Sequence, residues 1–106
     1  MTARLRVIAD PTRVRLMWAL DELGGATVQQ LADRLMTTHQ NTSKHLATLY
    51  QTGLVARTRE GTRMRYILAD WTALWLVEQI AASALAQVED QHRALVGEEQ
   101  SEHRTA

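Results

Sequence analysis

The stretch TTHQNTSKHLATLYQTG, residues 37–53, constrains the fold of this chain more than any other. Thr37 and Gln40 have the spacing of a capping box, which predicts a helix start, and Gly53 is typical of a left-handed helix end. One face of this helix is apolar or small, at Thr42, Leu46 and Leu49. The other face is polar, at His39, Gln40, Asn41, Ser43 and Lys44. Such a face is typical of a helix that contacts base edges and phosphates, although an ordinary surface helix can look the same.

The segment before this helix predicts a partner for it. Thr27 and Gln30 repeat the capping-box spacing and predict a helix over residues 27–35. Only residues 36–37 separate it from the helix over residues 38–51. Two helices joined by so short a link, with a small Ala32 where they would cross, predict a helix-turn-helix, although alanine is also a plain helix former.

The first 25 residues predict two more helices. Residues 2–9 suit a short helix, and Asp10 and Pro11 then supply the cap and the first residue of a longer one. The longer helix has an apolar face wide enough to lie on a core, formed by Val14, Leu16, Met17, Leu20 and Leu23. Trp18 lies away from the centre of that face, and we expect it to pack on a neighbouring element.

After Gly53 the apolar period changes from helical to alternating, which predicts a β-hairpin. Residues 54–59 and 63–68 form its strands and residues 60–62 its loop. Arginines surround the loop at Arg57, Arg59, Arg63 and Arg65. Cations can simply protect a solvated strand edge, but four arginines beside a single glutamate exceed that need. Since arginine suits phosphates and a narrow minor groove, we interpret the hairpin as a DNA-contacting wing.

Asp70 predicts the cap of a long C-terminal helix over about residues 71–96. Its heptad positions favour a helix pair and form, together with Leu5, the expected dimer surface: Leu74, Val77, Ala81, Ala84, Val88 and Leu95. Trp71 and Trp75 add apolar area that a domain of this size has little core to absorb. The partner is most simply the same helix of a second subunit, although packing on its own domain is the alternative.

Composition places the chain among single-domain proteins. We expect one domain over residues 1–97, mostly α-helical with a small β-hairpin, and a disordered tail over residues 98–106. The sequence has no cysteine, which excludes disulfides and thiolate metal sites within it. No apolar run reaches the roughly 18 residues of a membrane span, and the N-terminus lacks a signal-peptide core, so we expect a cytoplasmic protein.

The formal net charge of zero hides an asymmetry. Residues 1–69 carry ten Arg and Lys against five Asp and Glu, whereas residues 70–106 carry two against seven. A basic first part predicts a polyanionic partner, and an acidic remainder predicts a part that stays away from it.

The order of these elements and several motifs together resemble the ArsR/SmtB family of bacterial transcriptional repressors, over about residues 3–96. The motifs are Ala9-Asp10-Pro11-Thr12-Arg13, Ser43-Lys44-His45-Leu46, Gly53-Leu54-Val55, Glu60-Gly61 and Tyr66-Ile67-Leu68. The resemblance implies a winged helix-turn-helix homodimer that binds double-stranded DNA at a palindromic operator. It implies that the wing arginines contact the DNA backbone or the minor groove. It also implies that residues at the start of the recognition helix contact bases and phosphates: Thr38, His39, Gln40, Asn41, Ser43 and Lys44.

Many members of that family sense metals, and this chain departs from them. Their thiolate sites need cysteines, which are absent here. Their site on the dimer helix uses an Asp-x-His pair and two later ligands; Asp70 is present, but Thr72, Ser83 and Ala86 occupy the other positions. We therefore expect no cofactor and neither familiar metal site. One unfamiliar metal site stays open near the C-terminus, at Glu89, His92 and His103.

The sequence thus favours a dimeric, sequence-specific DNA-binding repressor with an unknown effector. One alternative is a winged-helix module that binds protein, which would not need four wing arginines. A second alternative is a metal sensor with the unfamiliar C-terminal site. An enzyme is disfavoured, because Ser43 and His45 lie two residues apart on diverging sides of a helix. His45 is better interpreted as structural.

Overall fold

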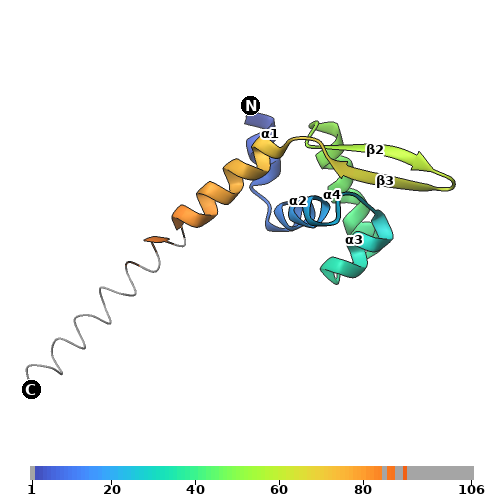
Figure 1. Ribbon diagram of the computed structural model, residues 1–106, viewed down its shortest axis with the longest axis horizontal. Coiled ribbons are helices and arrows are strands. Elements are labelled where there is room, and N and C mark those ends of the chain that lie inside the picture. The colour runs from blue at the N-terminus through green and yellow to red at the C-terminus, as the bar shows by residue number, and fades with distance from the viewer. Residues whose placement is uncertain (1, 85, 88–89, 91–106) are drawn as a thin grey trace, which may run out of the picture. The chain divides into compact units, whose positions relative to one another are not determined.

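The computed structural model describes residues 2–84, 86–87 and 90 (Figure 1). The chain divides into two compact units, Met1–Trp75 and Leu76–Ala106, and each is described by itself. The first unit holds α1 (Thr2–Ile8), α2 (Pro11–Leu23), β1 (Ala26–Thr27), α3 (Val28–Leu35), α4 (His39–Gln51), β2 (Val55–Glu60) and β3 (Arg63–Leu68). Residues 71–84 are helical. The mostly helical fold class, with a hairpin that projects from the helices, is confirmed (Figure 1).

Two predicted helix starts are confirmed by their caps. The Asp10 carboxylate accepts hydrogen bonds from the backbone N–H groups of Thr12, at 2.8 Å, and Arg13, at 3.2 Å. Thr27 and Gln30 form a complete capping box, in which each side chain accepts from the other residue's backbone N–H. Both caps satisfy donors that the first helical turn leaves without partners.

The predicted capping box of Thr37 and Gln40 at the start of α4 is wrong by one residue. Thr38 is the N-cap, and its hydroxyl accepts from the backbone N–H of Asn41 at 3.0 Å. Thr37 lies in the turn that closes α3, because its N–H bonds to the Ala32 carbonyl at 3.0 Å. The turn between these helices therefore uses one residue more than the sequence pattern indicated.

The predicted left-handed end of α4 at Gly53 is confirmed, with φ of 77°. The Leu54 N–H bonds to the Leu49 carbonyl at 3.0 Å, and the Gly53 N–H to the Tyr50 carbonyl at 3.1 Å. This pair of bonds is a Schellman motif. A side chain at Gly53 would also approach the Arg4 guanidinium to 3.0 Å, so both conformation and space favour glycine.

The hairpin belongs to a three-stranded antiparallel sheet with the order β1-β3-β2. The third strand, β1, was not predicted, because its two residues are too few to show alternation. Ala26 pairs with Tyr66, and Thr27 with Arg65. The loop is one residue shorter than predicted, since Glu60 pairs with Arg63 and leaves only Gly61 and Thr62 between the strands.

The core lies where the helices of the first unit meet the base of the sheet. The core includes some of the predicted inward residues of α2 and α4. Its largest fully buried side chains are Leu16, Met17, Leu20, Leu31, Leu46, Leu49 and Leu54. Thr42 is also buried, and its hydroxyl donates to the Thr38 carbonyl at 2.8 Å. Val14 is only half-buried and Leu23 is exposed, so the core face of α2 is narrower than predicted. Trp18 is exposed too.

Asp70 begins the C-terminal helix as predicted, since its carboxylate accepts from the Ala73 N–H at 3.0 Å. Leu74 is 3% exposed in the single chain and therefore belongs to the subunit's own core. Within the second unit Val77 is half-buried, and Ala81 and Ala84 are exposed. The predictions for Val88, Leu95, Glu89, His92, His103 and the tail over residues 98–106 lie outside the described residues. No helix in the described part is long and apolar enough to cross a membrane.

Candidate nucleic-acid interface

The open face of α4 carries most of the predicted contact residues. Leu46 and Leu49 fix the opposite face in the core. Residues four apart lie on one side of a helix, so His39 and Ser43 share a side, as do Gln40 and Lys44. These side chains make no hydrogen bond or ion pair with any part of the chain that the structure describes. They are therefore available to an outside partner.

The two remaining predicted residues of this region have structural roles. The Thr38 hydroxyl caps α4, as described above. The Asn41 side-chain amide donates to the Thr37 hydroxyl at 3.1 Å and braces the turn before α4. Thr38 and Asn41 therefore stabilise the start of α4.

The strand register places the wing arginines on two faces of the hairpin. Arg57 lies opposite Tyr66, and Arg59 opposite Met64, so these residues share the face that continues into the core. Arg63 and Arg65 alternate with Met64 and Tyr66 and therefore belong to the other face. The sequence alone groups the four arginines around the loop but does not assign their faces.

An open groove joins the recognition helix to the wing. It is lined by the first residues of α3, by His39 and Ser43 of α4, and by Thr62, Arg63, Met64 and Tyr66 of the wing. The structure thus brings His39, Ser43 and Arg63 to one surface. These groups offer hydrogen-bond donors and a positive charge, which suits a phosphate backbone that crosses from helix to wing.

Arg57 is held against the end of α4. Its guanidinium carbon lies 3.9 Å from the centroid of the Tyr50 ring. The Tyr66 side chain, as a hydrogen-bond acceptor, raises the pKa of Arg57 above its ordinary value, and Tyr50 acts in the same direction. Arg57 stays positively charged, and it links the wing to the recognition helix.

Arg65 points to the opposite side of the sheet. Its guanidinium donates to the Gly24 carbonyl at 3.2 Å, and its Nε lies 3.8 Å from a carboxylate oxygen of Glu60. A side chain at Gly25 would come within 2.9 Å of the same guanidinium. Arg65 therefore packs on the turn between α2 and β1.

Sequence reasoning missed the role of Arg13, although it noted the Asp-Pro-Thr-Arg motif. The Arg13 guanidinium donates to His45 Nδ1 at 3.2 Å and to the Val7 carbonyl at 3.1 Å. It thereby joins α1, α2 and α4. This contact within the protein supports the interpretation of His45 as structural.

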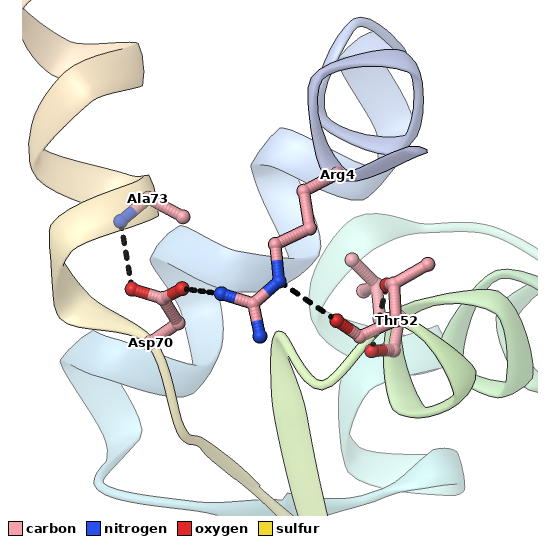
Figure 2. Close-up of polar contacts among 5 residues, drawn as sticks. Arg4, Thr52, Asp70 and Ala73 are labelled. Atoms are coloured by element: carbon pink, nitrogen blue, oxygen red, sulfur yellow. Dashed lines mark hydrogen bonds and ion pairs between the residues drawn. The ribbon is translucent and has the colours of Figure 1, made fainter. Parts of the chain in front are cut away.

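A second missed residue, Arg4, joins three elements (Figure 2). Its Nε donates to the Thr52 carbonyl at the end of α4, at 3.1 Å. Its Nη1 lies 2.6 Å from a carboxylate oxygen of Asp70, the residue that caps the C-terminal helix. The only sequence signal was an arginine on a short N-terminal helix, which cannot reveal so distant a partner.

The described residues contain no candidate metal site. No group of three or more His, Cys, Asp or Glu side chains there could hold a metal ion. The candidates Glu89, His92 and His103 lie outside that part of the chain.

Comparisons with known proteins agree with this geometry. Residues 8–58 match a protein-family model described as a helix-turn-helix domain. The HTH-type transcriptional regulator CmtR of Mycobacterium tuberculosis is 42% identical over 101 residues, which cover 91% of this chain and 85% of the relative. The region matched by the family model includes α2, α3 and α4.

Solved structures show the same architecture. The crystal structure of AntR, an antimony-specific transcriptional repressor, aligns with a TM-score of 0.71 and 27% identity, over 84% of this chain and 79% of that one. A homodimeric winged helix-turn-helix DNA-binding domain from Mycobacterium bovis, a possible ArsR-family regulator, aligns with a TM-score of 0.68 and 25% identity, over 78% and 76%.

Proposed function

The chain belongs to the ArsR family of winged helix-turn-helix transcriptional regulators, and we propose that it acts as a homodimeric repressor that binds a palindromic operator through α4 and the wing. The observation that carries the proposal is the open polar face of α4, whose opposite face is anchored in the core. That open face presents His39, Gln40, Ser43 and Lys44.

Each group on this face has a chemistry that DNA can use. The Gln40 amide can donate to and accept from the edge of an adenine in the major groove, and the Lys44 ammonium can neutralise a phosphate. His39 and Ser43 line the groove that leads to Arg63, so the backbone contact continues from the helix to the wing. Base contacts would then supply sequence selectivity, and phosphate contacts most of the affinity.

A second subunit explains the apolar side chains that the single chain leaves exposed. Those on the C-terminal helix include Trp71, at 61%, Trp75, at 58%, and Ile80, at 57%. Leu5 on α1 is also exposed. A monomer rarely leaves such residues in water without a partner. A twofold dimer would present two recognition helices to successive major grooves, which is why we expect a palindromic operator.

Fluorescence anisotropy tests the proposal directly. The full-length protein is titrated onto a labelled duplex from the region upstream of its own gene and onto a random duplex of equal length, at two salt concentrations. We expect tighter binding to the upstream duplex, and weaker binding to both at higher salt. Equal affinity for both duplexes would contradict the proposal and favour a protein-binding module.

The same titration tests metal dependence. We expect an unchanged affinity when zinc, nickel, cobalt or a chelator is added, because the chain lacks cysteine and the described residues offer no ligand cluster. Release of the duplex by one of these metals would contradict that expectation and direct attention to Glu89, His92 and His103.

A further inference from the structure

The four wing arginines differ in how far they lie from the tip of the hairpin. Each strand carries a pair two residues apart: Arg57 and Arg59 on β2, Arg63 and Arg65 on β3. In each pair one arginine lies close to the Gly61 turn and one lies closer to the base. The two strands therefore provide two matched comparisons between a tip position and a base position.

The base arginine of β2 is engaged with the protein itself. The Arg57 guanidinium lies 3.9 Å from the centroid of the Tyr50 ring of α4, and Arg57 pairs across the strands with Tyr66 of β3. Tyr66 is buried, so its ring is a fixed support, whereas Tyr50 is on the last turn of the recognition helix. A flat guanidinium stacked on the Tyr50 ring links the wing to the recognition helix more firmly than a hydrated ammonium could.

The base arginine of β3 is engaged as well. Arg65 donates to the Gly24 carbonyl at 3.2 Å and lies near Glu60 on the neighbouring strand. Gly25 leaves space for it, since a side chain there would collide with the guanidinium. Arg65 thus ties the central strand to the turn that follows α2.

The tip arginines make no such contacts. Arg59 and Arg63 are exposed, and their side chains have no hydrogen-bond, ion-pair or cation–π partner among the described residues. Arg57 is exposed too, and its contact with the Tyr50 ring is what distinguishes it from them. Arg63 also lines the groove that holds His39 and Ser43 of α4. Both charges are available to a polyanion without breaking a contact inside the protein.

We infer that the wing arginines have two separate roles. Arg59 and Arg63 neutralise DNA phosphates, whereas Arg57 and Arg65 are positioning residues that hold the wing in its binding orientation. The inference rests on the proposed function, because it assigns the wing's part in DNA binding. It predicts two different signatures for variants that remove the same charge.

The test compares Arg→Gln at all four positions, by anisotropy on the upstream and random duplexes over a range of salt concentrations. Removal of one phosphate interaction flattens the slope of log affinity against log salt by about 0.9, or about 1.8 for the two wings of a dimer. We expect that flattening for Arg59→Gln and Arg63→Gln, with unchanged melting temperatures. We expect Arg57→Gln and Arg65→Gln to weaken binding with nearly the wild-type slope and to lower the melting temperature without DNA.

A second set of variants keeps the charge and removes only the stacking. Arg57→Lys should lower both melting temperature and affinity, whereas its matched control Arg59→Lys should change neither greatly. Tyr50→Leu should reproduce the effect of Arg57→Lys, and the double variant should be little worse than either single one. These variants decide the question even if Arg57→Gln does not fold.

Equal flattening of the slope at all four positions would overturn the separation of roles while leaving DNA binding intact. An additive double variant of Tyr50 and Arg57 would overturn the positioning role of Arg57. Failure of the wild-type protein to bind either duplex would overturn both this inference and the proposed function.

Discussion

At the scale of single residues, Met36 is unusual. It has a φ of 56° and is the one non-glycine residue with positive φ in the described part of the chain. It ends α3, at the turn before the recognition helix, and its side chain is 93% exposed. A left-handed conformation costs an ordinary residue roughly 1–2 kcal/mol. The Met36 N–H bonds to the Ala32 and Asp33 carbonyls, but glycine would keep these backbone bonds, and the Met36 side chain gains nothing from its exposed position.

We expect Met36→Gly to raise the free energy of unfolding by up to about 1 kcal/mol, because the relief of strain exceeds the added freedom of glycine in the unfolded chain. Urea unfolding followed by circular dichroism measures this. Gly24→Ala is the matched control, because Gly24 is also left-handed and has open space where a side chain would lie. We expect Gly24→Ala to lower the free energy of unfolding by about 1 kcal/mol. A destabilised Met36→Gly protein would contradict this account of the turn.

Substitutions of Gln40 and Lys44, which share the open face of α4, should weaken DNA binding in different ways. If the Gln40 amide hydrogen-bonds to an adenine, Gln40→Ala should lower the binding free energy by about 1–3 kcal/mol and relax the base preference at that one position. Lys44→Ala should weaken binding to every duplex and flatten the salt slope by about 0.9 for each phosphate that is no longer neutralised. Competition anisotropy with single-base operator variants separates the two effects. An unchanged base preference in Gln40→Ala would remove its assigned role.

At the scale of elements, most local signals predicted the helix starts correctly, although the cap of α4 was predicted one residue too early. The caps at Asp10, Thr27 and Asp70 follow from neighbours within three residues, and all three are present. The strand β1 was missed because its partner, β3, lies almost forty residues away and only two residue pairs join them. The separate roles of the wing arginines were missed for a similar reason, since they depend on register and on Tyr50 of another element.

The Arg4 junction is an element-scale feature with a measurable contribution. Arg4 bonds to the end of α4 and to the cap of the C-terminal helix (Figure 2). We expect Arg4→Ala to lower the free energy of unfolding by about 1 kcal/mol, since it loses a hydrogen bond and a partly solvated ion pair.

The pair formed by Arg34 and Glu22 supplies the control, because it is a more exposed ion pair that has no third partner in the described part of the chain. Arg34→Ala should change stability by less than about 0.5 kcal/mol in the same urea experiment. Equal losses for the two variants would show that the junction adds nothing to an ordinary surface pair.

At the scale of the whole molecule, DNA affinity should depend on dimerisation. Ala81 lies on the heptad face of the C-terminal helix. We expect Ala81→Glu to give monomers in sedimentation velocity and to lose operator binding, whereas the small substitution Ala81→Ser at the same position stays dimeric and binds. A monomeric Ala81→Glu protein with full affinity would contradict the assigned dimer face.

The most direct test of the central claim is a hydroxyl-radical footprint of the full-length protein on its upstream region. A homodimer that places one α4 in each of two successive major grooves should protect two segments about 10 base pairs apart, related by twofold symmetry. A single protected segment, or protection without symmetry, would contradict the account of a dimer that reads a palindromic operator.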